Sequence, residues 1–188
     1  DEKYLYFGGR TKKLCQVPIS GNADFTVLYK SDYDLTSAVY SPEKRFLVFA
    51  SGYEIYFYDL KTNEIAQSIE ADKNFVNDLS FNHKGNNLAV WLENGNVKFW
   101  DYPSLKFNRT LKAGNKDYSH VAFSYDDKYF ATGNDAQAFN LWDMNSYTLK
   151  ERVSAHAKRV RAFSFHPFEA QLATGSYDGT VKIWKLET

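Results

Sequence analysis

Short apolar runs alternate with polar turns along the whole chain. Residues 46–50, 129–132 and 160–165 form such runs, each of strand length and rich in aromatic and β-branched side chains. No segment shows the apolar period of an amphipathic helix. The pattern therefore predicts an all-β protein made of short strands.

A repeat of 42 residues organises these runs. An aromatic residue followed by a charged residue closes one run in each copy, at Tyr58-Asp59, Trp100-Asp101, Trp142-Asp143 and Trp184-Lys185. A second aromatic marker ends an earlier run and precedes a polar turn, at Tyr40-Ser41, Phe81-Asn82, Phe123-Ser124 and Phe165-His166. A period of this length is typical of architectures in which each unit packs on its neighbours.

Each repeat is expected to hold four antiparallel strands. A polar turn separates the first strand from the second, and a hairpin rich in Gly, Asn and Asp separates the second from the third, as at residues 93–96 and 177–180. A further run, such as 148–153, supplies the fourth strand.

The first strand of the last repeat shows why one sheet cannot stand alone. Simple alternation places Phe163 and Phe165 on one face, and Val160, Ala162 and Ser164 on the other. Neither face is strongly polar, so the sheet needs cover on both sides. Stacked blades around an axis provide that cover, which predicts a β-propeller of four-stranded antiparallel blades.

Residues 172–184 closely resemble the WD-repeat family, and weaker forms of the same pattern extend over nearly the whole chain. In that family a His, a Ser or Thr, an Asp and the Trp form a buried hydrogen-bonded tetrad. The resemblance implies that His156, Thr174, Asp178 and Trp184 form this structural tetrad.

The earlier repeats depart from the family pattern. Lys30, Asp72 and Gly114 stand where the last repeat has His156, and Tyr58 replaces the Trp in the earliest of the four. We expect these blades to be held mostly by apolar packing and to be less rigid than a blade with a complete tetrad.

The repeat divides the chain into about five WD-type blades, three complete and two partial. The partial blades span residues 1–30 and 156–188, and the complete blades span 34–70, 75–112 and 117–153. The family most often closes its ring with more blades than this. We therefore expect part of a larger propeller, whose open ends meet the remaining blades or another subunit; the alternative is a small closed ring.

Composition narrows the function classes. Apolar residues make up 44% and charged residues 24%, as in ordinary globular proteins. No stretch approaches the roughly 18 uncharged apolar residues of a membrane helix, and residues 1–3 lack a signal-peptide pattern. Cys15 is the single cysteine, so the chain can form neither an internal disulfide nor a multi-cysteine zinc site. We expect an intracellular protein, cytoplasmic or nuclear, without membrane contact.

No residue pattern predicts catalysis. The sequence lacks a phosphate-binding loop, a dinucleotide fingerprint and a metalloprotease motif, and its histidines lack metal-ligand spacing. His156, Thr174 and Asp178 have the residue types of a hydrolase triad, but the family resemblance assigns them to the buried tetrad. We expect no enzyme activity, no metal and no cofactor.

The resemblance also implies which residues surround the central opening, on the face where partners usually dock. The partner-binding candidates are Phe75, Asn77, Glu93, Asp117, Asp135, Arg159, Arg161 and Tyr177. Interface hot spots favour aromatic and arginine anchors, so Phe75, Arg159, Arg161 and Tyr177 are the strongest of these. The alternatives are packing beneath a loop for Phe75 and ordinary solvated charge for the arginines.

Three functions fit this sequence. The first is a non-catalytic scaffold or adaptor that binds protein partners within a multi-subunit complex. The second is a regulatory sensor domain of a larger enzyme or ATPase. The third is nucleic-acid binding through basic loops, against which the balance of 23 basic and 23 acidic residues counts.

Overall fold

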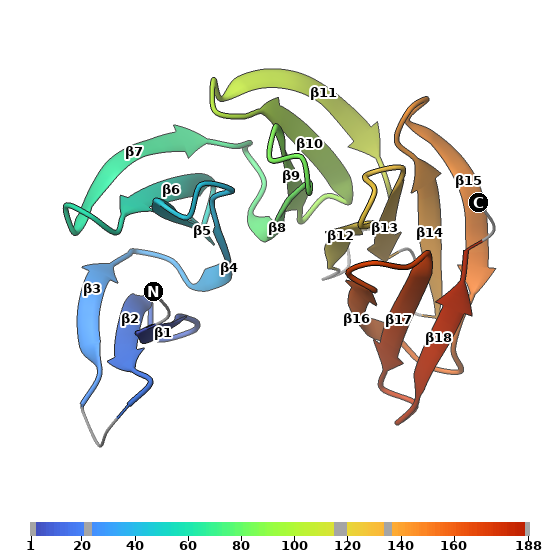
Figure 1. Cartoon of the computed structure of the whole chain (residues 1–188), viewed down its shortest axis with the longest axis horizontal. Helices are drawn as coiled ribbons and strands as arrows, with labels where there is room; N and C mark the ends of the chain where they lie inside the picture. The colour runs from blue at the N-terminus through green and yellow to red at the C-terminus, as the bar shows by residue number, and fades with distance from the viewer. Residues whose placement is uncertain (1–2, 21–23, 115–119, 134–136, 187–188) are drawn as a thin grey trace. The chain divides into compact units, whose positions relative to one another are not determined.

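The computed structural model describes residues 3–20, 24–114, 120–133 and 137–186, and in these ranges every regular element is a β-strand (Figure 1). The strands form five antiparallel sheets, and each sheet is built from consecutive strands paired in chain order. The described residues contain no helix long and apolar enough to cross a membrane. The prediction of an all-β fold is confirmed.

The chain divides into two compact units, Asp1–Val76 and Asn77–Thr188. The first unit contains a three-stranded sheet and a four-stranded sheet. The three-stranded sheet holds β1 (Tyr4–Phe7), β2 (Lys13–Pro18) and β3 (Thr26–Lys30). The four-stranded sheet holds β4 (Leu35–Tyr40), β5 (Phe46–Ser51), β6 (Glu54–Asp59) and β7 (Glu64–Glu70).

The second unit contains two four-stranded sheets and one three-stranded sheet. The first holds β8 (Val76–Phe81), β9 (Asn87–Leu92), β10 (Asn96–Asp101) and β11 (Lys106–Lys112). The second holds β12 (Val121–Phe123), β13 (Tyr129–Gly133), β14 (Ala138–Asp143) and β15 (Thr148–Ser154). The third holds β16 (Val160–Phe165), β17 (Gln171–Ser176) and β18 (Val181–Lys185). Within this unit the first strands β8, β12 and β16 lie on one side, and β11 and β15 lie on the opposite side (Figure 1).

The core of each unit lies between successive sheets. In the second unit, side chains of β10 pack against those of β12 and β13: the ring centroid of Phe99 lies 6.4 Å from that of Phe123 and 5.6 Å from that of Phe130. In the first unit, Leu14 of β2 and Phe49 of β5 are fully buried in one cluster. Apolar burial between sheets is the main contribution to the stability of such repeats.

The alternation predicted for the first strand of the last sheet is wrong at Val160, because the strand contains a β-bulge. The pairing register shifts between Val160 and Ala162, so one extra residue separates them. Val160 therefore lies in the same core cluster as Phe163 and Phe165, whereas the alternation places it on the opposite face. Ala162 and Ser164 remain on the other face and are exposed.

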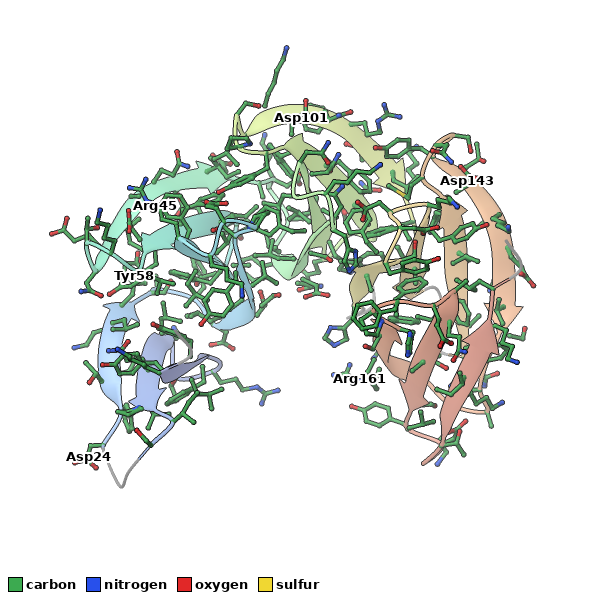
Figure 2. All side chains as sticks on the ribbon, viewed as in Figure 1. Asp24, Arg45, Tyr58, Asp101, Asp143 and Arg161 are labelled. Carbon is green, nitrogen blue, oxygen red and sulfur yellow. The ribbon has the colours of Figure 1, made fainter. Side chains whose placement is uncertain are left out.

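The repeated aromatic-Asp pair has a local structural reason. Oδ1 of Asp59 accepts a hydrogen bond from the backbone N–H of Lys61 at 2.8 Å, and Oδ1 of Asp143, which is labelled in Figure 2, accepts one from the backbone N–H of Asn145 at 2.9 Å. A short carboxylate thus caps the turn that follows the third strand. At Asp59 the guanidinium of Arg45, with Nη2 2.7 Å from Oδ2, lowers the pKa of the carboxyl below its usual value.

The hairpin glycines generate a stability prediction. Gly52 and Gly179 have φ angles of +62° and +83°. A residue with a side chain adopts such a φ angle at a cost of roughly 1–2 kcal/mol. A Cβ atom at Gly52 would also overlap the ring of Tyr33, whereas a Cβ atom at Gly179 would meet nothing within 4 Å. We expect Gly52→Ala to lower the midpoint of thermal unfolding more than Gly179→Ala does. Equal losses in the two variants would contradict the close packing of Tyr33 on Gly52.

Candidate functional site

Thr174 lies at the centre of a hydrogen-bonded chain in the last sheet. Its Oγ1 accepts a hydrogen bond from Nε1 of Trp184 at 2.9 Å and lies 2.8 Å from Nε2 of His156. On the other side of the imidazole, Nδ1 of His156 lies 3.0 Å from Oδ2 of Asp178. The structure therefore joins the four tetrad residues expected from the sequence.

The chain of contacts defines the tautomer of His156. The carboxylate of Asp178 only accepts hydrogen bonds. Nδ1 of His156 therefore carries a hydrogen and donates this hydrogen bond to Asp178. Nε2 is then an acceptor for the hydroxyl hydrogen of Thr174. The hydroxyl of Thr180, which donates to Oδ1 of Asp178 at 2.6 Å, is the main cause that holds the pKa of Asp178 well below its usual range.

The tetrad is less enclosed than the sequence predicts. His156 and Thr174 are buried, whereas the side chain of Asp178 is 11% exposed and Trp184 is half-buried. Trp142, one repeat earlier, is buried because β15 pairs with its strand β14 on the outer side. Trp184 lies on β18, which is the edge strand of its sheet in the described residues.

The other sheets keep only parts of this network. Nε1 of Trp142 donates to Oγ1 of Thr132 at 3.0 Å, which reproduces the Trp184–Thr174 bond. In the two preceding sheets fully buried Val90 and Val48 occupy the position of the threonine. Apolar packing replaces the hydroxyl there, and the lower rigidity of those blades stays a prediction.

A second polar link, which the sequence reasoning missed, joins the first strands of two sheets in the second unit. Oδ2 of Asp78 in β8 accepts a hydrogen bond from the backbone N–H of Val121 at 2.9 Å and lies 3.3 Å from Nδ1 of His120. The contact between Nδ1 of His120 and Asp78 raises the pKa of His120 above its usual value, although burial and the charge of Arg161 both act to lower that pKa. The signal available in the sequence is that residues 78 and 120 are one repeat apart.

Phe75 packs against Tyr33 and Tyr53, and the three residues form an aromatic cluster. Its ring centroid lies 4.6 Å from that of Tyr53 and 5.4 Å from that of Tyr33. The backbone carbonyl of Tyr33 accepts a hydrogen bond from the hydroxyl of Ser51 at 3.0 Å, which fixes the loop on the hairpin after β5. Tyr33 remains 44% exposed, whereas Tyr53 and Phe75 are half-buried, so Tyr33 supplies most of the exposed aromatic surface of the cluster.

The candidates of the last sheet lie together. The guanidinium carbon of Arg161 is 5.3 Å from the ring centroid of Tyr177, and the backbone N–H of Tyr177 donates to the carbonyl of Arg159 at 3.0 Å. Tyr177 is 63% exposed, whereas both arginines are half-buried.

Two of the remaining candidates, Asn77 and Glu93, lie within the described residues. Asn77 is buried in β8, and Glu93 is exposed in the hairpin between β9 and β10. Asp117 and Asp135 lie outside the described residues. Within the described ranges no three His, Cys, Asp or Glu side chains gather as metal ligands would.

The repeated antiparallel sheets of three or four strands, with a Trp–Thr–His–Asp network in the last of them, define a WD-type β-propeller fold. Two family models match the chain: the WD domain, G-beta repeat, at residues 147–185, and the Anaphase-promoting complex subunit 4 WD40 domain at residues 38–126. Together with the relatives below, these matches support the WD-repeat β-propeller family for this chain.

Two curated relatives and one solved structure illustrate the similarity. The probable coatomer subunit beta' of Schizosaccharomyces pombe is 31% identical over 63% of this chain and 15% of its own length. The LST8 homolog of Drosophila melanogaster is 30% identical over 53% of this chain and 34% of its own length. The β-propeller domain of Cps50 (Swd1) from Myceliophteria thermophila has a TM-score of 0.86 and 16% identity, covering all of this chain and 68% of that one. The chain thus spans well under half of the relatives' length, and the solved structure shows the fold alone.

The central position of Thr174 generates a prediction for the tetrad. Thr174→Val keeps the shape of the side chain but removes the partner of both His156 and Trp184, and an unpaired buried polar group costs about 1–3 kcal/mol. We expect it to lower the urea midpoint more than the matched variant Thr132→Val, which breaks only the bond to Trp142. A smaller loss in Thr174→Val would show that the network contributes little.

The lowered pKa of Asp178 generates a prediction for acid stability. Because the pKa is lower in the folded state, the ionised carboxylate stabilises the fold fully above the unfolded-state pKa of about 4. This stabilisation is lost as the pH falls through the folded-state value. Asp178→Asn should therefore destabilise the protein near neutral pH and lose less stability on acidification than the wild type, measured by urea unfolding at each pH. Asp24→Asn, at an exposed position shortly before β3, should behave like the wild type.

Proposed function

We propose that this chain is a non-catalytic scaffold or adaptor that binds protein partners within a multi-subunit complex. The matched relatives support the class: one is named a coatomer subunit, and one matched model is named for a subunit of the anaphase-promoting complex. We also propose an intracellular location, in line with the free, buried thiol of Cys15.

The aromatic cluster formed by Tyr33, Tyr53 and Phe75 is the observation that supports this proposal most directly. Exposed aromatic side chains that are already rigid lose little conformational entropy on binding, which is why they are common interface hot spots. Ser51 and Gly52 hold Tyr33 in place before any partner arrives.

The polar network of the last sheet supports a structural role and not a catalytic one. The hydroxyl of Thr174 is fully buried and engaged on both sides, so it cannot reach a substrate. His156, the base of any such triad, is buried as well. Of the functions considered, nucleic-acid binding is disfavoured by the neutral net charge of the chain.

The proposal is tested by purifying tagged protein from its native cells and comparing wild type with Tyr33→Ala. Truncation of an exposed anchor should cost about 1–2 kcal/mol of binding, so at least one stoichiometric partner should be recovered about tenfold less. Leu149→Ala is the matched control, because Leu149 is similarly exposed but lies on the outer strand β15.

A partner lost in Tyr33→Ala and retained in Leu149→Ala supports the proposal, provided that both variants keep the wild-type thermal midpoint. Equal recovery of a stoichiometric partner by wild type and by both variants would show that this partner does not bind the aromatic cluster. A chain that co-purifies with no protein at all would overturn the scaffold function.

A further inference from the structure

The first strands of the second unit bring three charged side chains to neighbouring positions. Asp78 lies in β8, His120 directly precedes β12, and Arg161 lies in β16. The ion pair between His120 and Asp78 spans the first two of these sheets, and the charge of Arg161 acts on His120 from the third. None of these three residues is part of the tetrad.

The β-bulge in β16 determines where Arg161 lies. Val160 pairs with Ser176 and Ala162 pairs with Gly175, so Arg161 is the extra residue that the ladder leaves unpaired. A bulged residue is aimed away from the regular alternation of its strand, and bulges are common beside functional sites. Figure 2 shows Arg161 at the β16 edge of the sheet, opposite β18.

The same bulge occurs in β4, where its side chain has a different use. There the extra residue is Thr36, whose hydroxyl donates to the backbone carbonyl of Val76 at 2.7 Å. Thr36 therefore ties its sheet to the next segment of the chain. Arg161, at the equivalent position, instead lies over the ring of Tyr177.

The surroundings of Arg161 are held rigid before any ligand binds. The hydroxyl of Ser176 donates to the carbonyl of Lys158 at 2.9 Å, and the N–H of Tyr177 donates to the carbonyl of Arg159. The basic loop at residues 158–159 is thus fixed on the hairpin that carries Tyr177. The side chain of His120 is 51% exposed, so an incoming group can reach it.

We propose that Arg161, His120 and Tyr177 form a site for an acidic segment of a protein partner. A carboxylate accepts two hydrogen bonds from the guanidinium of Arg161, the imidazole of His120 donates a further hydrogen bond, and the exposed ring of Tyr177 covers the aliphatic part of the acidic side chain. Bidentate, charge-assisted pairs of this kind are among the stronger polar contacts in proteins. This inference rests on the proposed function in that the partner is a protein.

Binding at this site depends on pH. Among the described residues, the charged groups that act on His120 are Asp78, which favours its protonation, and Arg161, which opposes it. The effect of Asp78 is the larger, so the pKa of His120 is raised. Protonated His120 adds positive charge and a donor for the carboxylate. The affinity is therefore highest when the histidine is charged and falls as the pH rises through its pKa.

The test measures the binding of a fluorescein-labelled peptide of alternating Glu and Gly to the full chain by fluorescence anisotropy. Arg161→Gln should weaken binding at least about tenfold, because it removes a charge-assisted bidentate contact. Arg161→Lys keeps the charge but loses the planar guanidinium, so its affinity for the peptide should lie between those of wild type and Arg161→Gln. Arg152→Gln, an exposed arginine on the outer strand β15, is the matched control and should bind like wild type.

His120→Gln separates the pH effect from general attraction. Wild type should bind the peptide several-fold more tightly at about pH 6 than at about pH 8, whereas His120→Gln should bind equally at both. Asp78→Asn should move the pH dependence of wild type to lower pH, since it removes the group that raises the pKa of His120.

Absence of peptide binding, or equal weakening by Arg161→Gln and Arg152→Gln, would overturn the site. Tighter binding of a single-stranded RNA oligonucleotide at the same residues would also overturn it, in favour of a phosphate ligand. These outcomes are independent of the scaffold function, because the partner recovery that tests that function depends on Tyr33 in the other unit. Unchanged thermal midpoints of the Arg161 variants exclude unfolding as the cause of any loss.

Discussion

Apolar burial between successive sheets is the interaction on which the rest of this structure depends. A lone sheet of three or four strands would leave both of its faces in water, and large side chains on those faces would stay exposed. Stacking a second sheet on the first buries these side chains. Phe99, Phe123 and Phe130, for example, come from two sheets and form one buried core. Every other feature of the second unit is built on sheets that are already stacked in this way.

Polar contacts between sheets then refine the stacking. The carboxylate of Asp127, in the turn after β12, accepts hydrogen bonds from the backbone N–H groups of His83 and Lys84 in the preceding sheet, at 2.7 and 2.9 Å. Lys182 donates to the carbonyl of Ala155 at 2.6 Å and thereby links the last two sheets. Such bonds act over short distances and require one register, so they fix how each sheet meets its neighbour.

One position of the repeat can keep its structural role while its residue changes. Nδ2 of Asn140 donates to the carbonyl of Ala113, and 42 residues later Nζ of Lys182 donates to the carbonyl of Ala155. The bulged position shows the opposite case, because Thr36 bonds to the backbone and Arg161 faces an aromatic ring. Positions that are free of a common structural role are those where a repeat protein can acquire binding chemistry.

The sequence alone determined the strands and the repeat, because both depend on local signals, whereas the tetrad was implied by the resemblance of residues 172–184 to the WD-repeat family. Alternating apolar residues, hairpin turns and the aromatic-Asp pair act within a few residues, and the repeat places His156 near Thr174 and Asp178 once the strands pair. Exposure of the tetrad was not predictable from the sequence. It depends on which strands cover a sheet from outside, as the difference between Trp142 and Trp184 shows.

Only the tertiary structure decided the face of Val160, the packing of Phe75 and the link between Asp78 and His120. A bulge adds one residue to a strand, and no local pattern in the sequence marks where it falls. Phe75 meets Tyr33 and Tyr53 because two loops distant in sequence fold over one hairpin. Contacts of this kind form only after the sheets have stacked, so their physical cause lies in the packing of the sheets and not in the local sequence.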